Sequence, residues 1–300
     1  MSHVDIRHRQ PSGWRSATAW IFVAPFLVIF FVFTAIPALI ALIYSFTDIG
    51  VADIRHPLQV HFTFLDTFAR VLTNAGFLKS LVTTGIFVVV GVPLTMAIGL
   101  ALALALNSGI KRLRATYRAA FYLPVITNIV AAAVIWQYAF TLRGPVNTFL
   151  AELGLQGPNW LGNPNMAITT VILLTTWRNV GTCMVLFLAG LQGIPADVHE
   201  AAAIDGASAP RRFLHITLPL LKPATLLVTV LMTVSYMNIF DEPYLLTKGG
   251  PLGATRSVAL WVYEQFGHGN IASAMAGSYV MLVIVAVLGI LQLRMLRAAS

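Results

Sequence analysis

Long apolar runs separated by short polar segments fill most of the chain. A helix needs about 20 apolar residues to cross the hydrocarbon core of a membrane. Isolated spans in lipid must satisfy their own backbone hydrogen bonds, and these runs lack the alternation of transmembrane strands. The pattern therefore predicts an all-α polytopic membrane protein with six transmembrane helices. The runs are Trp20–Phe46, Leu81–Leu106, Ala119–Phe140, Met166–Leu191, Leu218–Phe240 and Ala272–Leu293.

Composition and charge agree with a multi-pass membrane protein and suggest its orientation. Apolar residues make up 58% of the chain and charged residues 10%, against about 25% charged residues in a typical soluble domain. If both termini are cytoplasmic, 12 of the 19 lysines and arginines lie on the inside and six on the outside. Because cations concentrate on the cytoplasmic side, we expect both termini there, in a protein of the plasma or inner cell membrane. The position of the lysines and arginines at the ends of the spans accounts for the net charge of +8 and argues against nucleic acid as a partner.

The segments between the runs divide the chain into three parts. Residues 1–17 form a polar, basic cytoplasmic tail, and the first apolar run is too long for a signal peptide, so we expect it to be retained. Residues 18–80 hold the first transmembrane helix and an external loop, with a short helix expected near Phe64–Leu72. Residues 81–297 form a core of five transmembrane helices.

Several runs contain proline, including Pro37 and Pro93. Membrane helices tolerate proline, so we expect kinked, packed helices, although a hinge beside a cavity is the alternative. Cys183 is the single cysteine, which excludes an internal disulfide and favours a packing role.

The segment between the fourth and fifth runs, residues 195–219, predicts two short helices joined by a turn. Ala196–Ile204 is rich in alanine, a strong helix former. Gly206 favours a positive φ angle that ends this helix, and Ser208 suits the N-cap of the next one. Pro219 is expected to close the unit and to begin the next span. On its own, such a loop is a solvated connector or a knob that docks on another protein.

The spacing within this segment decides between those alternatives. It reads Glu200-Ala-Ala, three residues, Gly206, nine residues, and Ile216-x-Leu218-Pro219. This resembles the coupling motif of permease subunits in ABC importers, the loop that docks on a separate ATP-hydrolysing subunit. The residues that the resemblance assigns to coupling are Glu200, Ala201, Ala202, Asp205, Gly206, Arg211 and Arg212.

Other motifs extend the resemblance from about Leu81 to the C-terminus. They are Tyr122-Leu-Pro124, Trp136 with Phe140–Asn147, Trp177, Leu188–Pro195 and Leu246–Pro251. Together they resemble the first permease subunit of the maltose-type carbohydrate ABC importers.

The resemblance implies the type I importer permease fold, with a second homologous permease, an ATPase dimer, an external sugar-binding protein and a sugar substrate as partners in the lipid bilayer. The sequence has no Gly-x-x-x-x-Gly-Lys-Ser/Thr loop, so we expect a transport component rather than an enzyme, with no cofactor or metal.

Polar residues at membrane depth are candidates for the substrate pathway, because they are costly in lipid. Positions 175, 178, 179 and 182 share one helical face, and by alignment on Trp177 that face resembles the sugar-contacting stretch of the maltose permease. The alternative for threonine is a bond to its own helix backbone, and for the aromatic residues it is packing. The candidates are Asn128, Thr175, Trp177, Arg178, Asn179, Thr182, Ser235, Tyr236 and Asn238.

Arg178 leaves the substrate open. It is placed to pair with Asp241, with Glu242 or with the sister subunit, to bind a phosphate or carboxylate, or to bind sugar hydroxyls. The alternative substrate is therefore glycerol 3-phosphate or a related phosphorylated polyol. A transporter driven by an ion gradient and a membrane scaffold are the alternatives of a different class, although the absence of an internal repeat weakens the former.

Overall fold

The computed structural model describes residues 13–56, 60–108 and 113–297, and the regular secondary structure within them is helical apart from one isolated bridge between Thr47 and Phe62. Predictions that concern residues 1–12 lie outside the described part. Three π-helical turns, η1 (Phe31–Ala35), η3 (Phe87–Gly91) and η4 (Phe213–Thr217), and one 3-10 turn, η2 (Val51–Arg55), interrupt or connect the α-helices.

The first half of the described chain forms nine of the α-helices. They are α1 (Gly13–Phe30), α2 (Ile36–Tyr44), α3 (Asp66–Thr73), α4 (Ala75–Ile86), α5 (Val92–Ser108), α6 (Arg114–Ile126), α7 (Ile129–Ala139), α8 (Pro145–Glu152) and α9 (Pro164–Gln192).

The second half of the described chain supplies the remaining helices. They are α10 (Ala196–Ile204), α11 (Ala209–Arg212), α12 (Leu218–Leu220), α13 (Lys222–Met237), α14 (Asp241–Thr247), α15 (Val258–Gly267) and α16 (Ile271–Arg297).

Among the described residues, four continuous helices have the length and hydropathy to cross a membrane, and two bent pairs raise the number to six if each pair is one span. The prediction of six spans agrees with this upper number. The continuous spans extend slightly beyond the predicted runs at several ends, and α3 confirms the short helix expected near Phe64–Leu72. The four spans are Trp20–Tyr44, Ala75–Asn107, Pro164–Gln192 and Ile271–Met295.

The third and fifth predicted runs contain bends that are sharper than the helix kinks expected from their prolines. The third bends by 92° between α6 and α7, and the fifth bends by 66° between α12 and α13. At the first bend, the Asn128 side chain accepts hydrogen bonds from the backbone N–H groups of Val130 (2.9 Å) and Ala131 (3.3 Å). This cap starts a new helix and explains the break, because it replaces helical bonds that α6 would have supplied.

Proline explains the three π-helical turns. Each turn ends two residues before a proline, namely Pro37, Pro93 and Pro219. Proline has no N–H for the carbonyl four residues earlier, and in every case that carbonyl belongs to the middle residue of the five-residue turn. At these three prolines, the kinks expected from the sequence therefore take the form of a locally widened helix turn. Pro219 lies inside a helix that continues to Leu220, so the expectation that it begins the next span was wrong.

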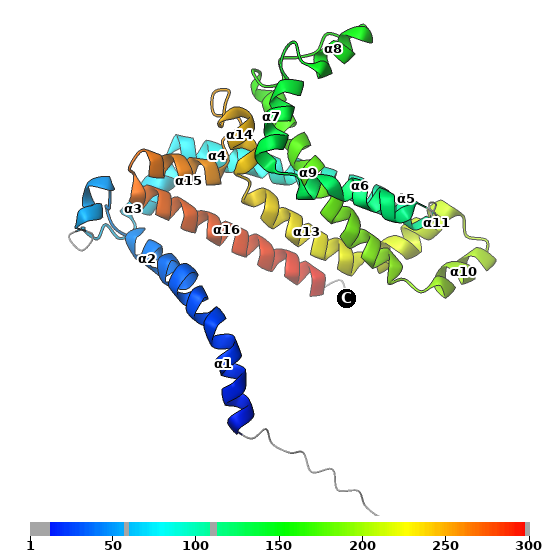
Figure 1. Cartoon of the computed structure of the whole chain (residues 1–300), viewed down its shortest axis with the longest axis horizontal. Helices are drawn as coiled ribbons and strands as arrows, with labels where there is room; N and C mark the ends of the chain where they lie inside the picture. Colours follow the sequence, from blue (N-terminus) through cyan, green and yellow to red (C-terminus); the bar gives the residue numbers. More distant parts are fainter. Residues whose placement is uncertain (1–12, 57–59, 109–112, 298–300) are drawn as a thin grey trace, which may run out of the picture.

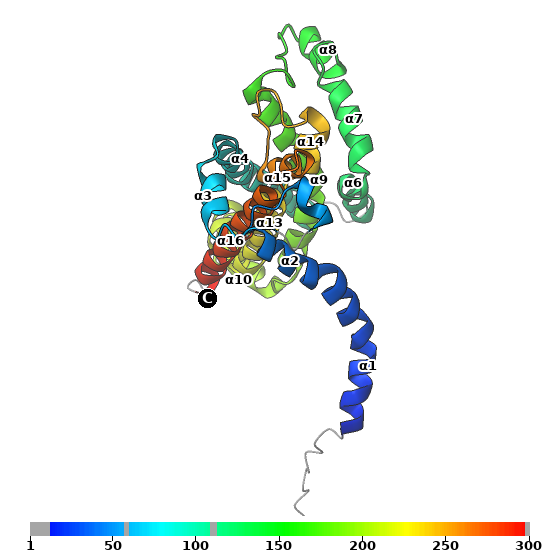
Figure 2. The same cartoon turned by 90° about the vertical axis from the view of Figure 1, so that its left-hand side faces the viewer.

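Helix α9 forms the centre of the molecule, and 61% of its apolar 18-residue stretch is buried. It packs against α5, α6 and α13 in the main body (Figures 1 and 2). Glycine allows a close approach here: a Cβ on Gly99 of α5 would lie 2.7 Å from the Cys183 sulfur on α9. The buried Cys183 thus has the packing role expected of it.

Two helical arms extend from this body (Figures 1 and 2). The span Trp20–Tyr44 has no buried residue in its most apolar stretch; its α2 part contacts α16, and its α1 part runs away from the other helices. The arm formed by α7 and α8 projects from the other side. Loop 193–208, with α10, lies at one end of the body.

Candidate functional site

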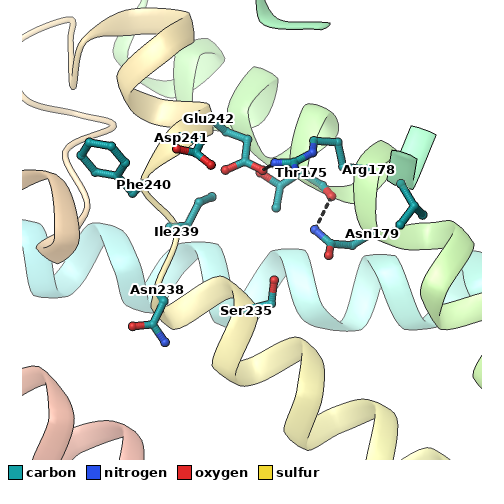
Figure 3. Close-up of a pocket in the computed structure, with 10 residues that line it drawn as sticks. Thr175, Arg178, Asn179, Ser235, Asn238, Ile239, Phe240, Asp241 and Glu242 are labelled. Carbon is teal, nitrogen blue, oxygen red and sulfur yellow. Dashed lines mark hydrogen bonds and ion pairs between the residues drawn. The ribbon is translucent and has the colours of Figure 1, made fainter. Parts of the chain in front are cut away.

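A polar cavity of about 220 Å³ lies between α9 and the junction of α13 with α14 (Figure 3). It combines charged, amide and hydroxyl groups inside a protein whose surface is largely apolar. The lining residues are Val125, Thr175, Arg178, Asn179, Ser235, Asn238, Ile239, Phe240, Asp241 and Glu242.

Two local features of the chain bring these groups together. On α9, Thr175, Arg178 and Asn179 follow at the spacing of one helical face, as predicted. On the other side, α13 ends at Met237, and the chain turns through three residues before α14 begins at Asp241. This turn places the first two residues of α14 opposite Arg178 (Figure 3).

Arg178 forms an ion pair with Glu242 across the cavity. Arg178 Nη1 lies 2.6 Å from Glu242 Oε1, and the side chains are 26% and 7% exposed, respectively. This confirms one of the partners that the sequence offered for Arg178. Burial raises the pKa of the Glu242 carboxyl, and the Arg178 charge acts in the opposite direction. The Arg178 Nε is buried and has no acceptor among the described residues.

The uncharged polar groups are partly committed to their own helices. The Thr175 hydroxyl donates to the Val171 carbonyl at 2.8 Å, which is the backbone bond considered for threonine. The Asn179 amide nitrogen donates to the Thr175 carbonyl, and the Asn238 nitrogen donates to the Val234 carbonyl, both at 2.9 Å. No hydrogen bond to either amide oxygen occurs in the described part, so both oxygens are available as acceptors.

Four of the candidate pathway residues do not line this cavity. Tyr236 is completely buried, and its hydroxyl lies 2.8 Å from Thr95 Oγ1 and 3.1 Å from Thr176 Oγ1. Asn128 caps α7, Trp177 packs against Trp136 with ring centroids 5.9 Å apart, and Thr182 is half-buried elsewhere on α9.

The cavity also contains Val125 and Phe240, which sequence reasoning did not single out. Neither carries a polar group, so no chemical signal distinguished them from the surrounding apolar residues. Glu242 and Asp241 were named only as partners of Arg178. An acidic pair directly after a span, combined with an arginine inside the neighbouring span, was the available signal.

Loop 195–219 has the helix and the turn that the sequence predicts. Helix α10 spans Ala196–Ile204, and Gly206 follows with φ of +74°. Ser208 precedes α11, but its side chain makes no capping hydrogen bond. Ile204 is 87% exposed, which is unusual for a large apolar side chain at a polar end of the molecule.

The residues assigned to coupling lie together on this loop. Ala202 is buried, Arg212 is half-buried and donates to the His199 carbonyl, and the others are exposed. The exposed residues are Glu200, Ala201, Asp205, Gly206 and Arg211. No group of His, Cys, Asp and Glu suited to a metal ion occurs among the described residues.

A helical membrane body with a central polar cavity and a helical loop between two of its spans is the architecture of a type I ABC importer permease. The chain belongs to the family of inner membrane components of binding-protein-dependent transport systems, whose model matches residues 76–299. It is therefore a multi-pass membrane protein and a transport component, not an enzyme.

Relatives and solved structures agree with this family. The chain is 36% identical to the probable ABC transporter permease protein YesP of Bacillus subtilis, over 94% of this chain and 90% of the relative. It is 34% identical to the lactose transport system permease LacF of Rhizobium radiobacter, over 91% and 92%. A chain of the bacterial alginate ABC transporter, solved with an alginate-bound periplasmic protein, superposes with a TM-score of 0.81 at 20% identity, covering 95% of this chain and 96% of that one.

Proposed function

We propose that the chain is one half of the translocation pathway of an ATP-driven sugar importer. The observation that carries this proposal is the polar cavity, whose two walls are the helices that flank loop 195–219. LacF is named for lactose, and the MalF protein of Thermococcus litoralis, 34% identical over 89% of each chain, for trehalose and maltose. Sugars are therefore the substrate class best supported.

The cavity has groups suited to sugar hydroxyls. A hydroxyl both donates and accepts a hydrogen bond. Arg178 is the donor here, the amide oxygens of Asn179 and Asn238 are acceptors, and the Ser235 hydroxyl does both. These four residues and Thr175 form the proposed pathway in this subunit. Trp177, Thr182, Tyr236 and Asn128 are proposed to support it through packing and helix geometry rather than by contact.

Loop 195–219 is the proposed docking site for a separate ATPase subunit. It lies at one end of the helical body (Figure 1). Ile204, Gly206 and Arg211 are exposed on it and available to a partner. We propose that this end is cytoplasmic, together with both termini, because the predicted topology places most lysines and arginines on the same side as this loop.

The exposed apolar span Trp20–Tyr44 supports a second permease subunit as a further partner. Lipid covers part of such a helix, and a homologous subunit beside it would cover another part and complete the cavity. An external binding protein delivers the sugar to the opposite end. The division into a tail, a first span with its loop and a core from residue 81 stays part of this proposal.

The test is the ATPase activity of the assembled complex in lipid, with its binding protein and a panel of lactose, maltose, trehalose and glycerol 3-phosphate. Stimulation by a neutral sugar is expected. Stimulation by glycerol 3-phosphate alone would refute the sugar assignment and support the phosphorylated alternative. Uptake driven by an ion gradient without any ATPase subunit would refute ATP coupling.

A further inference from the structure

We propose that Glu242 makes this cavity selective for uncharged sugars by neutralising Arg178. The inference rests on the proposed function, because it specifies the charge of the substrate that the same cavity accepts. It assigns a specificity-determining role to a residue that sequence reasoning treated only as an ion-pair partner.

Arg178 alone would make the cavity attractive to anions. A guanidinium binds carboxylates and phosphates through paired hydrogen bonds, and this preference strengthens away from bulk water. Among the lining residues it is the single cation, and the other two charged groups are Asp241 and Glu242. An anionic sugar would therefore have to be recognised by Arg178.

Glu242 already holds the position that such an anion would take. Its carboxylate lies 2.6 Å from Arg178, and its side chain is 7% exposed, so solvent screens the pair weakly. In the described part of the chain, Arg178 is the only ion-pair partner of the Glu242 side chain, whose carboxylate is also bonded to its own backbone. An anion that took the place of this carboxylate would leave it buried without a counterion, at a high energetic cost.

The helix that carries Glu242 is itself fixed. The Gln137 amide nitrogen on α7 donates to the carbonyls of Leu245 (2.7 Å) and Leu246 (3.1 Å) on α14. These bonds hold α14 against α7 and keep Glu242 directed at Arg178 (Figure 3). A fixed internal carboxylate therefore serves as the counterion, and a neutral sugar binds to the hydrogen-bonding groups that remain.

Asp241 provides a matched comparison. It lines the same cavity and carries the same charge one residue earlier, but it is exposed and forms no ion pair among the described residues. Removing either carboxylate changes the formal charge of the lining by the same amount. If the effect comes from the Arg178 pair rather than from total charge, only the change at Glu242 will alter selectivity.

The experiment measures inhibition of the sugar-stimulated ATPase of the assembled transporter in lipid. A neutral sugar and the binding protein drive the activity, and either glucuronate or glucose is titrated in as a competitor. Glu242→Gln keeps the size of the side chain and its ability to accept from Arg178, but removes its charge. We expect the inhibition constant of glucuronate to fall about tenfold in this variant, the scale of one charge-assisted hydrogen bond, with no change for glucose.

Three further results decide the inference. The wild type must show no preference for glucuronate over glucose, and Asp241→Asn must behave like the wild type. The double variant Arg178→Gln with Glu242→Gln must lose the tighter inhibition by glucuronate that Glu242→Gln shows. Equal gains in the Asp241 and Glu242 variants, or no gain in Glu242→Gln, would overturn the role of the pair while leaving the sugar importer intact. Failure of every neutral sugar to stimulate the wild type would instead refute the proposed function.

Discussion

The ring of Tyr236 on α13 lies directly against Gly91, the last residue of the π-helical turn before α5. A Cβ atom on Gly91 would overlap the Tyr236 ring carbons Cε1 and Cζ. The tyrosine hydroxyl is bonded to Thr95 and Thr176, so the ring has no room to withdraw. Three helices therefore meet at one buried tyrosine, and glycine is the residue that allows it.

Gly91→Ala is expected to destabilise this contact by about 1–3 kcal/mol, because overpacking forces either the ring or α5 to move. The measurement is the thermal midpoint of the assembled complex in detergent. Gly85→Ala on the same span is the control, since no atom lies within 4 Å of its Cβ position. Equal midpoints for the two variants would contradict the packing argument.

Breaking the Arg178–Glu242 pair from the arginine side is expected to cost more than removing both charges. Arg178→Gln leaves Glu242, at 7% exposure, without a counterion, and the expected loss is about 1–3 kcal/mol of stability. The double variant with Glu242→Gln should recover most of that loss. A thermal melt of the three proteins tests this, and a double variant no more stable than Arg178→Gln would show that the pair is not coupled.

Gly206→Ala is expected to lower the sugar-stimulated ATPase activity. Its cost in folding stability should be no larger than that of the matched variant Gly154→Ala. Gly206 and Gly154 both have φ near +75° and no atom within 4 Å of the Cβ position. An alanine at either site therefore pays the same backbone cost of about 1–2 kcal/mol. Only Gly206 lies in loop 195–219, so only its variant should lose sugar-stimulated ATPase activity.

Gly206→Asp extends this test by adding a charge at the proposed interface. It should abolish uptake while the protein still reaches the membrane. Normal uptake in this variant, or equal loss of ATPase stimulation in the Gly154→Ala protein, would exclude a contact between the turn and the ATPase subunit.

The sequence predicted the parts of the structure that depend on local chemistry. Alanine content and Gly206 defined α10 and its end, and the lone intramembrane arginine predicted an acidic partner that proved to be Glu242. The face shared by Thr175, Arg178 and Asn179 does line one cavity.

The remaining features depend on geometry that hydropathy does not contain. Asn128 and Leu221 stand inside the predicted apolar runs, so the breaks at these two residues left no trace in the pattern of runs. The rotation of α13 was equally hidden, because it is apolar on most sides. Tyr236 was therefore expected in the pathway, although it turns toward α5 and α9 and is buried.

The ion pair joins α9 to α14, two helices that lie on either side of loop 195–219 in the chain. Helix α9 runs from Arg178 to Gln192, the loop follows, and α13 returns to the turn before Glu242. The two cavity walls and the loop therefore belong to one continuous stretch of chain, residues 178–242, whose two ends meet at the Arg178–Glu242 contact. A movement that separated α9 from α14 would lengthen this contact, so the distance between Arg178 and Glu242 measures how far the two cavity walls have opened.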